Sequence, residues 1–281
     1  GADPMLRRLP AFRRPVAGRH NHRFWQRAAL VGQQRGLADV AEQARLRAEV
    51  VSSSLSVAVG CITEVRGVDA IVNCANEHLV GAQLPYINLD GSGGCIFDCM
   101  DKTVHSKAGP GLREACTELP VVEEGGDPRW GGIRCPLGQA RVTGAFGLEH
   151  CLHIVHVVGP QWPDTAEALR DAYQSCLQAA LAEPGGGNAS DPAGIKSLAV
   201  PAISGGIQQW PRDMSWAAGV EVMGGHLLEA LLRQDKRPGH DGGGPHLERV
   251  ILAAFDAESA AEATECLRRW AEGTLTEDGL L

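Results

Sequence analysis

The stretch from Val68 to Cys116 constrains the fold of this chain more than any other part of it. It opens with an apolar run at 68–75, which is too short to favour a helix and therefore predicts a buried strand. Two side-chain amides, Asn73 and Asn76, stand where that strand gives way to a loop. Asparagine often simply ends a strand and begins a turn. In an open α/β sheet, however, ligands bind at the carboxyl ends of strands, so both amides are candidates for a binding site.

The residues after this strand supply further groups suited to a ligand. Four glycines leave the backbone free to approach a ligand closely: Gly81, Gly91, Gly93 and Gly94. Asp101 and His105 are four residues apart and share one face of the helix that is predicted to begin there. The sequence therefore predicts that amides, a carboxylate and a glycine-rich loop converge on one crevice.

The composition excludes several classes of protein. With 281 residues and 44% hydrophobic content, the chain can form one well-packed domain with an extension. Its formal net charge of −8 argues against general nucleic-acid binding, which needs a basic face. No apolar run approaches the length of about 18 residues that a membrane helix needs. The 9 cysteines have irregular spacings, which is typical of reduced thiols in an intracellular protein.

Residues 1–54 are expected to form an extension ahead of the domain. Residues 1–4, GADP, precede Met5 and resemble a cloning remnant. From Met5 to Gly36 the chain is rich in arginine and has no acidic residue, which is typical of an organelle transit segment and also of a basic arm packed on a domain. We expect a cytoplasmic protein, with the mitochondrion or the plastid as the alternative. Apolar positions at 37–49 predict a helix on the outside of the domain.

Residues 55–281 alternate strands with helices. Strands are expected at 55–59, 68–75, 139–146, 153–158, 195–203 and 250–255. Helices are expected from Asp101 to a break at 109–111, and then at 112–116, 165–183, 214–234 and 258–271. This alternation predicts an α/β domain with a mixed, mostly parallel sheet covered on both faces. The loop at 120–134 offers no evident chemistry.

A second glycine-rich turn follows the strand at 195–203, with the sequence Ser204-Gly205-Gly206-Ile207-Gln208. Such a turn between a strand and a helix exposes backbone N–H groups, which is how α/β proteins hold phosphate without a cation. An ordinary tight turn would have the same composition.

Five segments resemble, in order, the motifs of the macrodomains, a family whose fold binds ADP-ribose: VDAIVNCAN at 68–76, DKTVHSKAGPGL at 101–112, CPLGQARVTGAF at 135–146, HIVHVVGPQW at 153–162 and LAVPAISGGIQQWP at 198–211. The resemblance covers about residues 55–260 and implies a three-layer α/β/α fold. The segment CMDKTVHSKAGPGLR at 99–113 resembles a narrower branch, which carries zinc in its first loop and removes mono-ADP-ribose from proteins.

The resemblance, together with the chemistry of breaking the bond between ribose and its acceptor, suggests roles for individual residues. The candidate catalytic set is Asn76, which would bind the distal ribose, Asp101, which would orient or deprotonate a water molecule, and His105. The ligand-binding set contains the backbone amide of Ile62, the turn that would cradle the diphosphate, and Phe255, which would stack on adenine unless it is a core residue. That set comprises Ile62, Asn73, Gly93, Gly94, Ser204, Gly205, Gly206, Ile207, Gln208 and Phe255.

Two positions depart from the family pattern. Cys61 stands where macrodomains usually place the aspartate that reads adenine, and a thiol is a poor acceptor. Gln208 stands where an aromatic residue is frequent, and Trp210 is near enough in the sequence to compensate.

The zinc ligands would come from Cys95 and Cys99. Two cysteines four residues apart in a glycine-rich loop can reach one ion, and a catalytic zinc keeps three protein ligands. The zinc-containing branch implies a histidine between its cysteines, but this chain has none there. The third ligand is therefore open: Asp98, His78 or His105. Two small core cysteines, or a redox pair, are the alternatives.

The sequence thus predicts a monomeric hydrolase that releases mono-ADP-ribose from modified proteins, with an acidic side chain as the acceptor. Its partners would be ADP-ribose and mono-ADP-ribosylated proteins, without nucleic acid or membrane. One alternative is a reader that binds ADP-ribose without turnover, and the other is a hydrolase of a small metabolite such as O-acetyl-ADP-ribose. Asp101 favours an enzyme, because a reader needs no carboxylate beside the glycosidic carbon.

Overall fold

The computed structural model describes residues 40–81, 99–127, 130–182, 194–235 and 246–275. The chain divides into two units, Gly1–Glu42 and Gln43–Leu281, and almost all of the first unit lies outside the described residues. Several residues singled out from the sequence also lie outside them: Gly91, Gly93, Gly94, Cys95 and Asp98.

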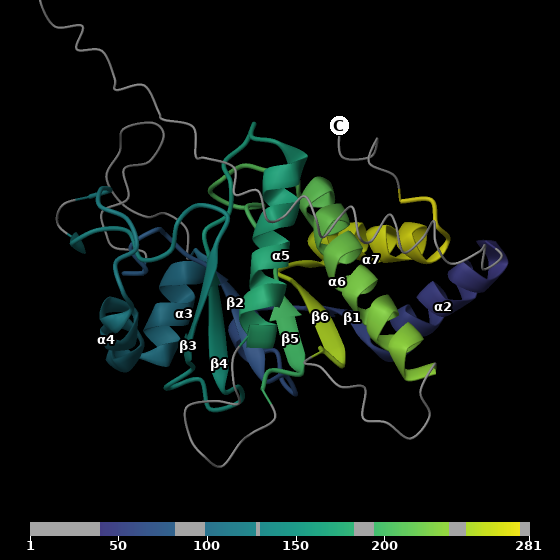
Figure 1. Ribbon diagram of the computed structural model, residues 1–281, viewed down its shortest axis with the longest axis horizontal. Helices are drawn as coiled ribbons and strands as arrows, with labels where there is room; N and C mark the ends of the chain where they lie inside the picture. The colour runs from purple at the N-terminus through teal and green to yellow at the C-terminus, as the bar shows by residue number, and fades with distance from the viewer. Residues whose placement is uncertain (1–39, 82–98, 128–129, 183–193, 236–245, 276–281) are drawn as a thin grey trace, which may run out of the picture. The chain divides into compact units, whose positions relative to one another are not determined.

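Six strands form one mixed sheet in the order β1-β6-β5-β2-β4-β3 (Figure 1). Their bounds are β1 (Leu55–Val59), β2 (Ala70–Cys74), β3 (Ala140–Gly144), β4 (His153–Val157), β5 (Ser197–Val200) and β6 (Arg249–Ala254). Neighbouring strands are parallel except β3, which runs antiparallel to β4 at the edge. The predicted mixed, mostly parallel sheet is confirmed.

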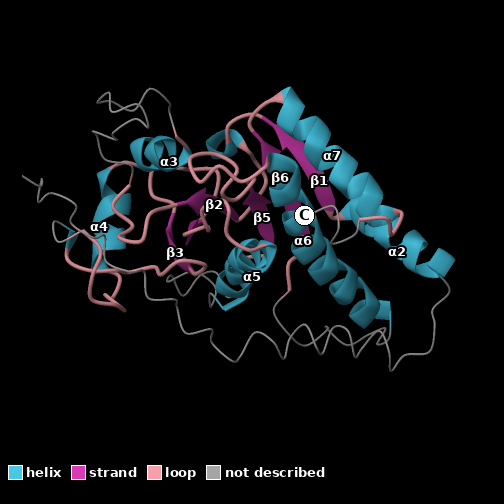
Figure 2. Cartoon of the chain, turned by 90° about the horizontal axis from the view of Figure 1, so that it is seen from above, coloured by secondary structure: helices cyan, strands magenta, loops and turns pink. Residues whose placement is uncertain are grey.

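Helices cover both faces of this sheet (Figure 2). Their bounds are α2 (Val40–Ser53), α3 (Met100–Ala108), α4 (Pro110–Glu118), α5 (Ala166–Ala182), α6 (Arg212–Asp235) and α7 (Ala257–Ala271), with a short 3₁₀ helix at Ile62–Glu64. Helices α3 and α4 pack on one face, α5 and α6 on the other, and α7 packs against α6, β1 and β6. This arrangement confirms the three-layer α/β/α fold.

The helix boundaries differ from the expected ones for local reasons. Helix α4 begins at Pro110, two residues before the expected start at Leu112. Proline is tolerated at the first helical position because the missing N–H has no partner there. Gly109 separates α3 from α4 with a φ of 80°, which favours glycine. Helix α7 begins where the Asp256 carboxylate accepts a hydrogen bond from the backbone N–H of Ser259 (2.8 Å).

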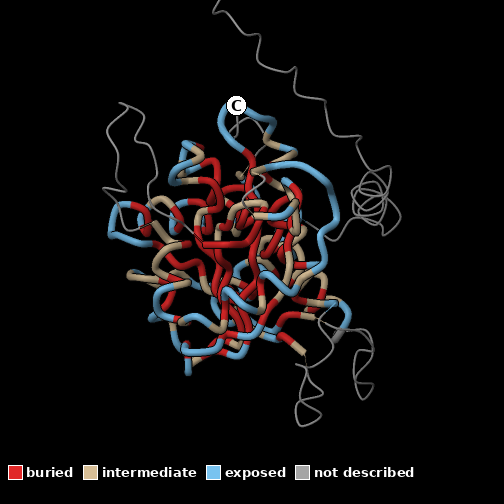
Figure 3. Tube along the Cα trace, turned by 90° about the vertical axis from the view of Figure 1, so that its left-hand side faces the viewer, coloured by how far each residue is buried: buried red, intermediate tan, exposed pale blue. Residues whose placement is uncertain are grey.

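Buried residues gather at the centre of the tube in Figure 3, and strands β2 and β4 consist almost entirely of buried residues. Strand β2 is buried on both sides, because alternate residues point to opposite helix layers. Ile71 belongs to the core that contains α3 and α4, so Asn73, two residues later, points to the same layer. Within the described part of the chain, no helix is both long and apolar enough to cross a membrane.

Half-buried His226 in α6 makes a contact through which the stability of this fold depends on pH. Its Nε2 accepts a hydrogen bond from the backbone N–H of Leu247, just before β6 (3.1 Å). Burial lowers the pKa of His226 to about 4, and the positive charge of Arg233 adds to the effect. The folded protein therefore holds this ring neutral at pH values where the unfolded chain, with a histidine pKa of about 6.5, takes up a proton.

We therefore predict that His226 contributes to acid unfolding. As pH falls from about 6.5 to about 4, the free energy of unfolding should fall, because the unfolded chain binds the additional proton. The substitution His226→Gln keeps an acceptor for Leu247 and removes the titration. It should reduce the slope by up to about 1.4 kcal/mol per pH unit in urea unfolding. Identical slopes for the variant and the wild type would contradict this assignment.

Candidate functional site

Asp101 lies in the first turn of α3, and its carboxylate is held by the two asparagines that flank the end of β2. Oδ1 accepts a hydrogen bond from Asn73 Nδ2 (2.8 Å), and Oδ2 lies 3.5 Å from Asn76 Nδ2. Asp101 is only 5% exposed, and burial raises its pKa to about 6, against the opposing effects of Asn73 and the Arg113 charge. At neutral pH the site thus contains a buried carboxylate that is oriented on both of its oxygens.

Asn76 also organises the loop that follows β2. Its Oδ1 accepts from the backbone N–H groups of His78 (3.1 Å) and Val80 (3.4 Å), and its Nδ2 donates to the carbonyl of Gly81 (3.1 Å). Such a side chain closes a turn by replacing backbone partners. Asn76 therefore lies half-buried at the end of the strand, with its amide beside Asp101.

Asn73, which was expected to bind the ligand, is fully buried. Its amide nitrogen lies between Asp101 Oδ1 and Nδ1 of His156 on β4 (3.2 Å). Asn73 thus supports the carboxylate from beneath in this structure, and its side chain has no surface open to a ligand.

His105 follows Asp101 by one turn of α3, as the spacing predicted. Its Nε2 lies 3.6 Å from Asp101 Oδ1, and its side chain is 8% exposed. Neither ring nitrogen has a hydrogen-bond partner among the described residues. Burial lowers the pKa of His105 to about 4, so the ring is neutral. Gly81 packs against it so closely that a Cβ there would lie 2.8 Å from the ring, which explains the need for glycine.

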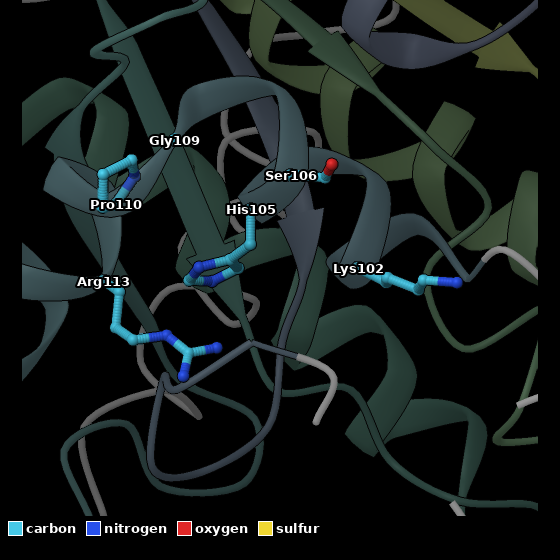
Figure 4. Close-up of a pocket in the computed structure, with 6 residues that line it drawn as sticks. All are labelled: Lys102, His105, Ser106, Gly109, Pro110 and Arg113. Carbon is cyan, nitrogen blue, oxygen red and sulfur yellow. The ribbon is translucent and has the colours of Figure 1, made fainter. Parts of the chain in front are cut away.

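A pocket of about 320 Å³ opens beside His105, between α3 and α4 (Figure 4). It is lined by Lys102, His105, Ser106, Gly109, Pro110 and Arg113. Two of these residues are cationic, and the Arg113 charge lowers the pKa of both Asp101 and His105. The pocket thus combines two cationic side chains with the neighbouring Asp101 carboxylate, which lies in the first turn of the same helix as Lys102.

The turn after β5 presents unpaired backbone donors. Within it, the N–H of Gly205 bonds to Ala202, that of Gln209 to Gly206, and that of Trp210 to Ser204. The N–H groups of Gly206, Ile207 and Gln208 have no partner among the described residues. This arrangement suits a phosphate, because adjacent backbone amides can bind an anion without a cationic side chain.

Tyr173 of α5 fixes the start of this turn, a role that sequence reasoning missed. Its hydroxyl accepts from the N–H of Ile203 (2.9 Å) and lies 2.8 Å from Ser215 Oγ. Ser215 in turn donates to the carbonyl of Ile203 (2.7 Å). In the sequence Tyr173 is indistinguishable from the other apolar positions of its helix, because its partners are about 30 and 40 residues away.

The aromatic residues near the site are arranged differently from expectation. Trp210 is only 2% exposed, so it cannot offer a face to a ligand and does not compensate for Gln208. It packs edge-on against Trp162, which is 42% exposed and whose N–H bonds to the carbonyl of Gln208. Phe255, at the end of β6, is 77% exposed, which excludes the core alternative.

The adenine end of the expected site lies at the end of β1. Ile62 opens the 3₁₀ helix with a buried side chain, and N–H groups in a first turn have no partner within the helix. Cys61 is half-buried, with its Sγ 2.9 Å from the hydroxyl of Thr63.

The described residues offer two partial sets of metal ligands. Cys99 is half-exposed directly before α3. His78 is not available beside it, because its Nδ1 bonds to the Gly132 carbonyl (2.7 Å) and its Nε2 accepts from the N–H of Asp127 (3.0 Å). Through these two bonds the loop at 120–134 anchors the segment that follows β2, which is a structural role for that loop. His105 has both ring nitrogens unpaired, which suits a ligand.

The second set is buried beneath Asp101. The ligating atoms of His105, Cys116 and His156 all lie within 4.8 Å of one another. His156, however, already uses both ring nitrogens, one toward Asn73 and the other toward the Thr143 hydroxyl (2.9 Å). A metal there would have to displace one of these bonds, so this set fits a metal less well than a hydrogen-bonded cluster.

Comparisons with known proteins identify the family. The Macro domain model matches residues 72–218, more than half of the chain. The O-acetyl-ADP-ribose deacetylase of an Enterobacter species is 33% identical over 73% of this chain and 89% of its own. A macro domain-containing protein of Xanthomonas axonopodis is 37% identical over 54% of this chain and 68% of its own.

Solved structures agree with the fold. The Oceanobacillus iheyensis macrodomain with ADP superposes with a TM-score of 0.56 at 23% identity, over 78% of this chain and 92% of its own. The Trypanosoma brucei macrodomain in complex with ADP has a TM-score of 0.51 at 19% identity, over 82% of this chain and 71% of its own. By its sequence motifs, its sheet topology and these relatives, the chain belongs to the macrodomain family.

Proposed function

We propose that this protein hydrolyses ADP-ribose that is linked through its distal ribose to a carboxyl group. The observation that carries the proposal is the Asp101 carboxylate, buried and oriented by Asn73 and Asn76 at the carboxyl end of the sheet. A binding protein gains nothing from a buried negative charge next to an anionic ligand. Relatives named O-acetyl-ADP-ribose deacetylase support a hydrolytic role.

The geometry suggests which residues would bind each part of an ADP-ribosyl ligand. The N–H groups of Gly206, Ile207 and Gln208, which none of the described residues accepts from, would bind the diphosphate, and the exposed ring of Phe255 would stack on adenine. With these two parts fixed, the distal ribose would lie near Asn76, whose amide would hold its hydroxyls. Asp101 would then orient the attacking water or accept its proton, and would stabilise positive charge that develops on the sugar.

The acceptor of the ADP-ribose is the part of the proposal with two candidates. A protein carboxyl is the first, as the sequence motifs suggested. The acetyl group of O-acetyl-ADP-ribose is the second, and the names of the relatives favour it. The two differ in the bond that breaks: water would replace the protein carboxyl at ribose C1 in the first case, and would attack the acetyl carbonyl carbon in the second, releasing acetate and a ribose hydroxyl. Asp101 could orient or deprotonate the water in either reaction, but it would stabilise positive charge on the sugar only in the first. Parallel assays on O-acetyl-ADP-ribose and on a protein mono-ADP-ribosylated at acidic side chains would rank them.

We predict that Asp101→Asn separates binding from turnover. Asparagine preserves the shape of the side chain but removes the charge, so hydrolysis of the preferred substrate should fall by at least about 100-fold. The Kd for ADP-ribose in calorimetry should change by no more than about threefold. Glu229→Gln, on a carboxylate paired with Arg233 in α6, is the matched control and should leave both values unchanged.

Other outcomes of the Asp101→Asn experiment lead to different conclusions. Equal loss of binding and hydrolysis would make Asp101 a structural residue. A wild-type protein that binds ADP-ribose tightly but releases no product from either substrate would overturn the hydrolase and leave a reader.

We also propose that zinc binds next to this site, through Cys95 and Cys99 with His105 or Asp98 as the third ligand. Cys99 is half-exposed beside α3, and the unpaired nitrogens of His105 support its inclusion. Thiolate and imidazole ligands suit zinc. A zinc ion held there would lower the pKa of a bound water molecule or bind ribose directly.

Elemental analysis tests the metal without reference to activity. Protein purified without chelators should carry about one equivalent of zinc, and Cys99→Ser should lose it. Cys116→Ser is the matched control and should keep the metal, because Cys116 belongs to the buried set. Loss of metal in Cys116→Ser alone would move the site to His105, Cys116 and His156. Metal-free, fully active wild type would rule out zinc.

A further inference from the structure

A row of buried polar side chains runs beneath Asp101 across three adjacent strands. Asn73 on β2 is the direct register partner of His156 on β4. His156 is paired in turn with Arg141 of β3, and Thr143 lies two residues further on the same face. Asn73 and His156 are fully buried, and Thr143 is 8% exposed. None of these three side chains is placed to contact a ligand, and the proposed mechanism assigns no role to the last two.

The hydrogen bonds in this row have one consistent direction. An ionised carboxylate only accepts hydrogen bonds, so Asn73 must turn its NH₂ group toward Asp101 Oδ1 (2.8 Å). The second hydrogen of that NH₂ group then points at His156 Nδ1 (3.2 Å), which must accept. The opposite orientation of the amide would place two acceptor oxygens against each other at this short distance.

The same order of donor and acceptor extends from His156 to Thr143 on the edge strand β3. Because His156 Nδ1 accepts, the hydrogen of the neutral ring is on Nε2, which donates to Thr143 Oγ1 (2.9 Å). The Thr143 hydroxyl donates in turn to the carbonyl of Gly144 (3.1 Å). Burial lowers the pKa of His156 to about 3, which agrees with a neutral ring. Each donor in the row thus meets an acceptor.

We propose that His156 and Thr143 are positioning residues for Asp101. They act through Asn73, whose NH₂ group they keep directed at the carboxylate, and the inference rests on the proposed hydrolase function. The Thr143 hydroxyl gives its own hydrogen to the Gly144 carbonyl, so its oxygen is left to accept and it selects the tautomer of His156 that carries a hydrogen on Nε2. That tautomer leaves Nδ1 able to accept from Asn73. Without the hydroxyl the other tautomer becomes accessible, and its Nδ1–H favours the reversed amide, in which the Asn73 oxygen replaces the NH₂ group beside Asp101 Oδ1.

The same reasoning explains why the set of His105, Cys116 and His156 is a poor metal site. Cys116 Sγ lies 3.8 Å from His156 Nε2, but that nitrogen carries a hydrogen in the tautomer required by Asn73. Binding of a metal to Nε2 would need the opposite tautomer, and with it a reversed amide beside Asp101.

Thr143→Val tests the proposal with little change in shape, and Thr143→Ser is the matched control because it keeps the hydroxyl. In Thr143→Val, kcat should fall about three- to tenfold, as expected for loss of one orienting hydrogen bond. KM and the Kd for ADP-ribose should stay unchanged, because the row does not contact the ligand. Thr143→Ser should restore kcat to within about twofold of the wild type. Unchanged kcat in Thr143→Val, or equal loss in both variants, would overturn the proposal.

NMR measures the tautomer of His156 directly and needs no turnover. In ¹⁵N-labelled wild type at pH 7, His156 should give the pattern of a neutral ring with its hydrogen on Nε2. In Thr143→Val the signals should shift toward a mixture of tautomers. A hydrogen on Nδ1 in the wild type, or an unchanged tautomer in the variant, would contradict the inference even if the wild type proved inactive. An active wild type with an unaffected variant would refute the inference alone.

Discussion

The structure depends on keeping one negative charge inside the protein. Burial disfavours the ionised form of a carboxyl group, and for this reason the pKa of Asp101 is raised to about 6. The charge is tolerated because each of its oxygens faces a side-chain amide and because Arg113 lies near enough to lower the pKa. Both amides come from the end of β2, so the carboxylate is held by groups whose positions the sheet determines. Placement of α3 relative to β2 is therefore the central constraint on the site.

The position of Asn73 beside Asp101 depends in turn on the register of β2 in the sheet. Asn73 reaches Asp101 only because it shares a face of β2 with Ile71, which anchors the core on the side of α3. A shift of β2 by one residue would turn Asn73 toward α5 and place Val72 beneath the carboxylate. Pairing with β4 on one side and β5 on the other, together with burial on both faces, makes such a shift costly. The packing of the apolar residues of β2 therefore determines that Asn73 faces α3 and Asp101.

Local patterns in the sequence predicted the fold and part of the site. Strand and helix bounds follow from periodicity, so those expectations agree with the structure to within a few residues in nearly every element. Asp101 and His105 are four residues apart in one helix, a relation that spacing alone reveals. The Asx turn at Asn76 is equally local.

Contacts between distant segments could not be predicted in the same way. His78 bonds to a loop about 50 residues away, in which the sequence offered no evident chemistry. Tyr173 resembles any apolar helix residue until the turn after β5 packs against its hydroxyl. Trp210 is near enough in the sequence to compensate for Gln208, but at 2% exposure it belongs to the core. In each case the deciding quantity was the tertiary environment of the side chain, which periodicity does not contain.

The two halves of the proposed site have opposite electrostatic character, and this difference orients a ligand. The turn at 204–208 offers backbone donors that have no partner within the described part of the chain, whereas Asp101 offers only acceptors. A diphosphate is attracted by the first group and repelled by the second, so an ADP-ribosyl ligand can bind in one direction only, with its uncharged distal ribose at the carboxylate. In the proposed reaction, hydrolysis of an uncharged ester would create a new carboxylate beside Asp101. A repulsion that was absent in the substrate would then arise in the product and favour its release. Under this proposal the buried charge, although costly to hold, would serve both substrate orientation and departure of the acid product.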